Sequence, residues 1–483
     1  MIPRRTFLAT AAASLASAQS PSLFNRLDQG PFEIEQDEGW LTIHTTTPWH
    51  GRLRNPGLGL IGYTWEEAGP SLAARARSET LQQHVDRLAA LPFVDVLYIR
   101  CDWRHVQSEP GKLNLHPVWK LTLDAAKQRG LRVAFRVQLS NPNSPGGLLA
   151  VPDFVKDRVP MVTIGAGKTP SLEPRYDHPA FQSAFRELNQ LLSAEFDGHP
   201  SLEWVDLCQY GFWGEGHTAN LGTPFPDYAT AERTMVAMTE MQLAAWRRTP
   251  LAVNTQPDIS HVGNRRVIDL ATKAGAWLRS DSILIEEPIQ IEMLSNRPPW
   301  LAAILEDGYD RTYEASRTPR LIQAIRHALD VGSNYWALWT ESANLAKFFE
   351  AQPELLSEVQ SRLGYRVRPS WVWQRKRHGA YELVVAIAND GVAGVPGVLH
   401  LELRAGGGFQ ATGSLDKGHP NAGRLRQCAF TLPRELEGRR VSLHAELEIR
   451  PGVRRPVQWA VNPDEGIAFD LLKWNDTRWR KDV

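Results

Sequence analysis

The feature that most constrains the fold is a regular alternation of short apolar runs with longer amphipathic stretches from residue 57 to about residue 340. Stretches such as "WKLTLDAAKQRG" carry apolar residues at helical spacing and end at a glycine. Between them lie eight strand-like runs, at residues 57–65, 94–103, 132–140, 202–213, 250–256, 276–282, 311–316 and 333–340. Eight consecutive strand–helix units predict an α/β fold of the (β/α)₈ TIM-barrel type.

The pattern changes after residue 365. Residues 366–483 contain no long helical pattern and read as short alternating runs such as "YELVVAIAN" and "RVSLHAELEIR", separated by Gly, Pro and Asn turns. This pattern predicts an all-β sandwich domain behind a barrel domain of residues 49–365. Residues 19–48 include a further predicted strand pair and form a short N-terminal β segment.

The first 18 residues have the features of a twin-arginine export signal. Arg4 and Arg5 precede an Ala-rich run that ends in small residues at Ala16-Ser17-Ala18. We therefore expect a mature chain that begins near Gln19 and is periplasmic or extracellular. The apolar run is too short to span a bilayer, and no later run is long enough, so no membrane association is expected after export.

Composition narrows the choice of ligand. Lys plus Arg equals Asp plus Glu at 54 each, so no net field attracts nucleic acid or an anionic membrane surface. The 17 Trp residues supply core filler and flat platforms for the apolar faces of sugars. Three widely spaced cysteines exclude a disulfide framework, and we expect them to be buried thiols. A single disulfide between Cys101 and Cys208 is the alternative. Neither CxxC nor HExxH is present, and we expect no metal and no organic cofactor.

Active sites of TIM barrels lie at the C-terminal ends of the strands. The candidate residues predicted there are Arg100, Asp102, Trp103, Gln138, Trp213, Glu215, His217, Asn254, Gln256, Glu314, Trp339 and Glu341. Glu215 and Glu314 are assigned to the fourth and seventh strands, which face each other across the barrel. Glycoside hydrolysis requires two carboxyl groups directed at one bond. One protonates the leaving oxygen, and the other either attacks the anomeric carbon or activates a water molecule.

The sequence around these two glutamates favours the same chemistry. Glu215 follows Tyr210, Phe212 and Trp213, and a glycine on each side lets a substrate approach its carboxyl group. Arg100 is expected beside Glu314, where a guanidinium group would keep a nucleophilic carboxylate ionised. Glu341 is a rival nucleophile, since the eighth strand also ends at the barrel mouth.

The order of these residues carries a family resemblance. An Arg ends the second strand, Glu ends the fourth and seventh, and a Trp lies on the eighth, while "WRHVQSEPGKLNLHPVWKLTLDAAKQRGLRVAFRV" is similar to two units of β-galactosidase-like enzymes. The chain thus resembles clan A of the retaining glycoside hydrolases. Through "NPGLGLIGY", "YGFWGEGH" and "VAIANDGVAGVPG" it resembles more closely a bacterial family that pairs such a barrel with a C-terminal sandwich.

The resemblance implies that Glu215 is the acid/base, Glu314 the nucleophile, Arg100 its partner and Trp339 the platform under the attacked sugar. One position departs from the clan, where an Asn usually precedes the acid/base and contacts the sugar 2-hydroxyl. Here that position is Gly214, and Asn254 or Gln256 are the substitutes considered for this contact.

Several residues keep more than one interpretation. His217 binds sugar, contacts and orients Glu215, or is an ordinary histidine of a surface loop, and Trp103 and Trp213 either stack on sugar or pack in the core. The expected function is an exported retaining glycosidase that acts on a poly- or oligosaccharide. Two rivals are a non-catalytic carbohydrate-binding barrel and a polysaccharide lyase that would use Arg100, Arg136 and Arg279 to bind uronates.

Overall fold

The computed structural model of the chain describes most of its residues. The described ranges are 31–32, 39–65, 69, 79–144, 147–165, 170–219, 221–255, 264–281, 288–307, 318–338, 342–465 and 467–480. The predicted export signal lies outside them. Within these ranges, no helix is both long and apolar enough to cross a membrane.

Eight parallel strands close into a barrel, as the alternating pattern predicts. Each strand pairs with the next barrel strand in chain order, and the last pairs with the first. The strands are β2 (Gly59–Trp65), β3 (Val96–Asp102), β4 (Arg132–Gln138), β7 (Leu202–Asp206), β8 (Leu251–Asn254), β9 (Trp277–Ser280), β10 (Ala303–Asp307) and β11 (Tyr335–Leu338).

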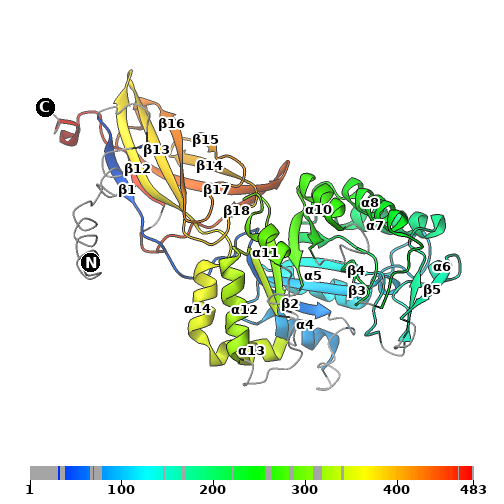
Figure 1. The fold of residues 1–483 in the computed structure, drawn as a ribbon. Helices are drawn as coiled ribbons and strands as arrows, with labels where there is room; N and C mark the ends of the chain where they lie inside the picture. Colours follow the sequence, from blue (N-terminus) through cyan, green and yellow to red (C-terminus); the bar gives the residue numbers. More distant parts are fainter. Residues whose placement is uncertain are drawn as a thin grey trace, which may run out of the picture.

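Helices surround this barrel (Figure 1). They are α4 (Leu81–Ala89), α5 (Pro117–Arg129), α7 (Pro179–Phe196), α8 (Tyr228–Ala245), α10 (Asn264–Lys273), α11 (Pro288–Ser295), α12 (Thr318–Asp330), α13 (Ser342–Ala351) and α14 (Pro353–Arg362). The short helix α6 (Asp153–Lys156) and the hairpin of β5 (Met161–Ile164) and β6 (Ser171–Pro174) lie between β4 and α7. Helix α5 shows the expected end signals, with Pro117 in its first turn and Gly130 at φ 64° after its last residue.

The seventh barrel strand differs from the prediction. It is β10, Ala303–Asp307, and the barrel closes with it. The interpretation of residues 311–316 as this strand is therefore wrong, and that segment lies outside the described residues, between β10 and α12. The sequence "AILED" is short and ends in two acidic residues that suggest a loop. Both acidic side chains are nevertheless buried in the structure.

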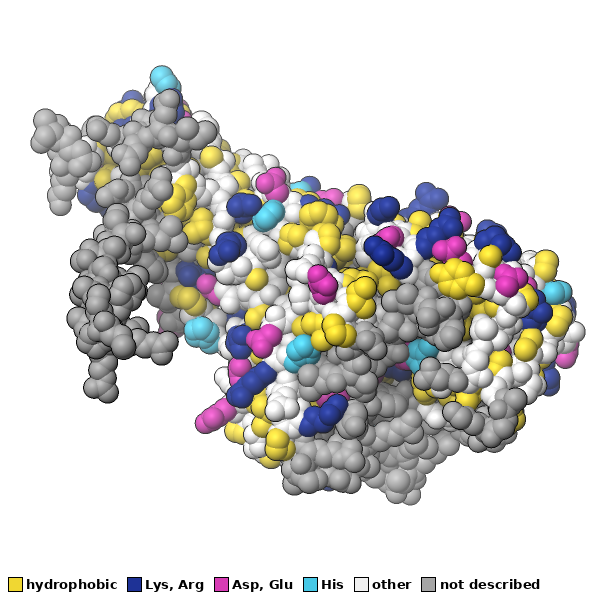
Figure 2. Space-filling model, viewed as in Figure 1, with side chains coloured by type: hydrophobic (Ala, Val, Ile, Leu, Met, Phe, Trp, Pro, Cys, Tyr) yellow, Lys and Arg dark blue, Asp and Glu magenta, His cyan; other side chains and the backbone are white. Residues whose placement is uncertain are grey.

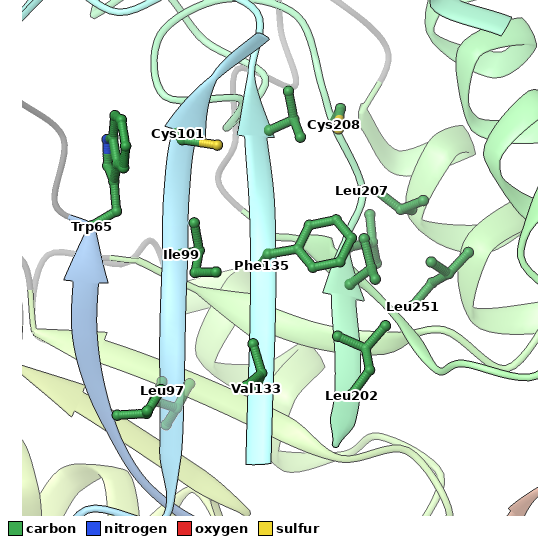
Figure 3. Close-up of a cluster of buried hydrophobic side chains, with 14 of the residues drawn as sticks. Trp65, Leu97, Ile99, Cys101, Val133, Phe135, Leu202, Leu207, Cys208 and Leu251 are labelled. Atoms are coloured by element: carbon green, nitrogen blue, oxygen red, sulfur yellow. The ribbon is translucent and has the colours of Figure 1, made fainter. Parts of the chain in front are cut away.

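The alternating faces of the strands form two different environments. One face packs against the helices, as Figure 3 shows for Leu97, Ile99, Val133 and Phe135. Cys101 and Cys208 belong to this cluster and are free, buried thiols, so the expectation of unbridged cysteines is confirmed. The opposite face points into the barrel, where the lower layers are apolar and aromatic and the upper layers are charged.

Two antiparallel sheets follow the barrel and enclose a second hydrophobic core, in agreement with the predicted sandwich. The first has the order β1 (Leu41–Thr45), β12 (Val367–Arg377), β13 (Ala380–Asn389) and β16 (Leu425–Leu432). The second has the order β15 (Phe409–Ser414), β14 (Val398–Ala405), β17 (Arg440–Arg450) and β18 (Val453–Val457), with β19 (Ala468–Asp470) also paired to β17. Strand β1, from the predicted N-terminal segment, is thus an edge strand of the sandwich.

The sandwich packs against the N-terminal end of the barrel (Figure 1). Glu203, at the start of β7, is fully buried and accepts hydrogen bonds from Arg132 (2.7 Å), Tyr335 (2.5 Å) and, across the domain boundary, Arg455 of β18 (2.6 Å). This contact sets the sandwich against the end of the barrel opposite the expected active site. On the face drawn in Figure 2, basic and acidic side chains are interspersed, in keeping with the equal numbers of the two in the sequence.

Candidate active site at the mouth of the barrel

Glu215 lies in an irregular loop that follows β7. The chain leaves the barrel at Asp206, and Gly211, Trp213, Gly214 and Gly216 adopt positive φ values of 76°, 56°, 74° and 85°. Glycine adopts such a conformation at no steric cost, which suits the three glycines to this path, whereas Trp213 adopts it with strain. A Cβ atom on Gly214 would also lie 3.3 Å from Arg136 Cδ. Glycine at position 214 thus fits both the backbone conformation and the space beside Arg136.

Three side chains hold the Glu215 carboxyl group. Its Oε1 accepts hydrogen bonds from Arg100 Nη1 (3.2 Å) and Arg136 Nη1 (3.1 Å), and its Oε2 lies 3.0 Å from His217 Nε2. His217 Nδ1 accepts a hydrogen bond from the Ala219 backbone N–H (3.2 Å). A neutral His217 ring consequently carries its proton on Nε2 and donates it to Glu215. The structure thus shows His217 in contact with Glu215, and the sugar contact of His217 stays a prediction.

Beneath Glu215 lies a buried charge cluster that we call the barrel network. Its members are Arg100, Arg136, Arg279, Asp206, Glu215, Asp281 and Glu306, all at most 6% exposed. Arg100 bridges Glu215 and Glu306, with Nη2 at 2.9 and 3.1 Å from the two Glu306 oxygens. Arg136 bridges Glu215 and Asp281 (3.2 Å), and Arg279 bridges Asp281 (2.5 Å) and Glu306. Each guanidinium group is thus neutralised by at least two carboxyl groups.

The barrel network contains four carboxyl groups and three guanidinium groups. The excess negative charge is removed when Glu306 is protonated. Burial raises the pKa of Glu306, and the Asp281 carboxylate adds to this effect, so that Arg100 and Arg279 offset it only in part. At Asp281 burial acts in the same direction, but Arg136 and Arg279 outweigh it and hold its pKa well below the ordinary value. Below about pH 7 Glu306 is therefore protonated, which leaves the buried cluster close to neutral.

Glu306 is the site residue that sequence reasoning missed. It lies on the true seventh strand, within reach of Arg100, where the sequence placed Glu314. Glu314, Gln256, Trp339 and Glu341 lie outside the described residues, so their roles stay predictions. By chain order Glu314 belongs to the connection between β10 and α12.

The remaining predicted residues have structural partners. Asp102 binds Asn141 (2.8 Å) and Ser144 (2.9 Å) and thereby anchors the loop after β4, while Asn254 donates to Asp281 (2.5 Å). Trp103 is fully buried, packs against Phe181 and other core rings and donates from Nε1 to Gln107. The prediction of a sugar contact by Trp103 is wrong, because no part of its ring is exposed.

Several buried polar atoms near Glu215 have no hydrogen-bond partner among the described residues. They are both amide atoms of Gln209, Oε1 of Gln138 and Nε1 of Trp213. Gln209 lies under the Glu215 loop, because a Cβ atom on Gly216 would be 2.8 Å from Gln209 Oε1. Gln138 ends β4, and its amide nitrogen binds Asp102 (3.2 Å). Buried polar groups in folded proteins are usually hydrogen-bonded, so these four atoms are placed to bind water or a polar ligand at this end of the barrel.

No set of His, Cys, Asp or Glu side chains in the described part of the chain is arranged to hold a metal ion. Searches with protein-family models and among curated proteins found no match to the chain. Among solved structures, endo-glycoceramidase II from Rhodococcus sp. is 13% identical with a TM-score of 0.37, over 79% of this chain and 99% of that protein. Exo-β-1,4-mannosidase from Opitutaceae bacterium strain TAV5 is 16% identical with a TM-score of 0.39, over 64% and 56%. Similarities at this level do not establish a shared function.

Proposed function

We propose that the chain is an exported glycoside hydrolase that cleaves an O-glycosidic bond of a poly- or oligosaccharide with retention of configuration. The observation that carries the proposal is the setting of Glu215. Its carboxyl group is held by Arg100, Arg136 and His217 on the loop after the fourth strand of a TIM barrel, beside unpaired buried polar atoms. Export is proposed from the twin-arginine pattern of the first 18 residues.

In the proposed reaction Glu215 is the acid/base and Glu314 the nucleophile. Glu314 attacks the anomeric carbon while Glu215 gives its proton to the leaving oxygen, and Glu215 then takes a proton from the water that releases the sugar. His217 and the two arginines fix the direction of the Glu215 carboxyl group, which is the pre-organisation that proton transfer at one oxygen requires.

Glu306 is a weaker candidate for the nucleophile than Glu314. It contacts Arg100, but its side chain is 1% exposed and its raised pKa favours the protonated form. A nucleophilic carboxylate has to be ionised and has to reach the sugar. We therefore assign Glu306 a supporting position beneath the site.

The barrel network argues against a polysaccharide lyase. Arg100, Arg136 and Arg279 each pair with carboxyl groups of the protein. Binding a uronate with any of these cations would leave a buried protein carboxylate without its partner, at a cost of several kcal/mol. The remaining alternative is a barrel that binds a carbohydrate without cleaving it, and measurements of hydrolysis distinguish the two.

The test compares hydrolysis by the wild type with that by Glu215→Ala, Glu314→Ala and Glu306→Gln on a panel of polysaccharides and aryl glycosides. We expect losses of about 10³-fold or more in the first two variants and a smaller loss in the third. Azide should restore turnover of an activated glycoside in one of the alanine variants. Equal activity in all four proteins, or binding of a sugar by the wild type without cleavage, would overturn the proposal in favour of a binding barrel.

A further inference from the structure

A cavity of about 840 Å³ lies on the outer face of the second sandwich sheet, and we call it the sandwich pocket. It is lined by strands β14, β15, β17 and β18 and, after β18, by Gln458, Trp459, Val461, Pro463 and Ile467. On β18, Arg454 and Pro456 line the pocket, whereas Arg455 between them reaches the barrel residue Glu203. Successive side chains of β18 thus point in opposite directions, one way into the pocket and the other way toward the barrel.

The floor of the sandwich pocket is a polar array set by strand register. Ser414, His400 and Glu446 stand opposite one another on β15, β14 and β17 and form one row. Thr412, Glu402 and His444 form the next row on the same three strands. Directly paired residues of antiparallel strands project from the same side of a sheet, so both rows face the pocket.

The charged side chains that line the pocket balance in number, because Glu402 and Glu446 are matched by Arg404 and Arg454. Glu402 pairs with Arg404 (2.6 Å), and the neighbouring Glu448 pairs with His400 (2.9 Å) and Arg454 (3.1 Å). The pocket therefore has no dominant field to attract an anion or a cation. It offers hydroxyl, imidazole and carboxylate groups, which exchange hydrogen bonds with the hydroxyl groups of a neutral ligand.

One wall of the sandwich pocket is apolar. It consists of Pro456, Trp459, Val461, Pro463 and Ile467, and the Trp459 Nε1 donates to the carbonyl oxygen of Leu443 on β17 (3.0 Å), which holds Trp459 against the sheet. A polar floor beside an apolar wall matches a sugar chain, whose rings have hydroxyl edges and apolar faces. We infer that the sandwich pocket binds a neutral oligosaccharide, at a second site that is independent of the catalytic role proposed for the barrel.

The volume is consistent with this ligand, because small-molecule sites in proteins usually enclose about 300–1,000 Å³. A pocket of about 840 Å³ accommodates a short stretch of sugar units. If the barrel has the proposed glycosidase activity, such a site would keep a polysaccharide bound to the protein and raise the local concentration of its substrate.

Isothermal titration of the full chain tests this inference. The host is the Glu215→Gln protein, so that slow or absent hydrolysis leaves the ligand intact, and the probes are neutral gluco-, manno- and galacto-hexasaccharides with an oligogalacturonate as the anionic comparison. The pocket variants are His444→Ala and Glu446→Gln. The matched control is Glu435→Gln, an exposed sandwich residue that does not line the pocket.

We expect at least one neutral hexasaccharide to bind, with a Kd raised about tenfold or more in both pocket variants and unchanged in the control. Thermal unfolding of each variant shows whether the fold is intact. The inference would be overturned by any of three results: a Kd that is the same in the pocket variants as in the host protein, binding of the anionic probe alone, or no binding of any probe. Hydrolysis by the wild type is recorded separately, so that failure of the proposed catalysis is distinguished from failure of the second site.

Discussion

At the residue scale, the protonation and direction of a few buried groups decide what the barrel mouth can do. His217 donates to one oxygen of Glu215 while Arg100 and Arg136 donate to the other. A carboxyl group with both oxygens occupied has little freedom to rotate. The acid proposed for the reaction is therefore positioned by neighbours on two other barrel strands and on its own loop.

We expect His217→Ala to lower kcat/KM about 10- to 100-fold, because Glu215 loses a hydrogen bond to one oxygen and the restraint that it provides. The loss should fall mainly on kcat and should change the pH profile, which a purely structural residue would not do. Initial rates between pH 4 and 9 measure both effects. His50→Ala is the control, since His50 is exposed and outside the site. Unchanged kinetics in His217→Ala would contradict the bracing role.

A second prediction concerns Glu306 and stability. Burial raises its folded pKa to about 7 from an ordinary value of 4.5. The protonated form is thus favoured by folding, so this contribution to stability is complete below about pH 4.5 and is lost as pH rises through about 7. The wild type should lose up to roughly 3 kcal/mol over this window relative to Glu306→Gln, whose side chain does not titrate. Denaturant unfolding at pH 5, 6, 7 and 8 measures the difference, and parallel curves would refute the assignment.

At the element scale, the alternating pattern was sufficient to predict the barrel and the sandwich, but not every boundary. The seventh strand was assigned to residues 311–316 instead of β10, because Glu306 is buried in β10 only through its pairing with Arg100 and Arg279 of other strands. Such pairing depends on cross-barrel geometry that no local pattern contains. The two interpretations of Trp103 stay open in the sequence for a related reason, since an aromatic residue at a strand end can turn toward the mouth or toward the helices.

The loop from residue 207 to 219 supplies the third prediction. Gly214 has φ 74°, which alanine adopts only with strain and asparagine tolerates better. We expect Gly214→Ala to cost roughly 1–2 kcal/mol and to lower activity, and Gly214→Asn to cost less in both respects. Gly211→Ala is the reference for severe damage, because its Cβ atom would lie 2.1 Å from the His217 carbonyl oxygen. Melting temperatures and rates for the three variants test this order, and an equal effect of Ala and Asn at position 214 would contradict it.

At the scale of the whole molecule, the two domains are joined through a buried ion pair at the end of the barrel opposite Glu215. Burial alone would raise the pKa of Glu203, but Arg132 and Arg455 outweigh it and lower that pKa. The stability from this group is therefore present above its unfolded pKa and is lost as pH falls through the lower folded value. The sandwich thus contributes to the stability of the barrel through a charge that the barrel cannot neutralise equally well alone.

This arrangement leads to a double-mutant test of the domain interface. Arg455→Ala removes one of the two cations from a fully buried carboxylate and should destabilise the protein by about 2–4 kcal/mol at pH 7. Arg454→Ala, one residue away and exposed with a surface ion pair, should cost less than about 1 kcal/mol. Adding Glu203→Gln to Arg455→Ala should recover part of the loss, because the buried charge is then gone. Thermal and denaturant unfolding of the wild type and these three proteins measure the effect. A similar cost for Arg454→Ala and Arg455→Ala would show that the interface does not depend on this pair.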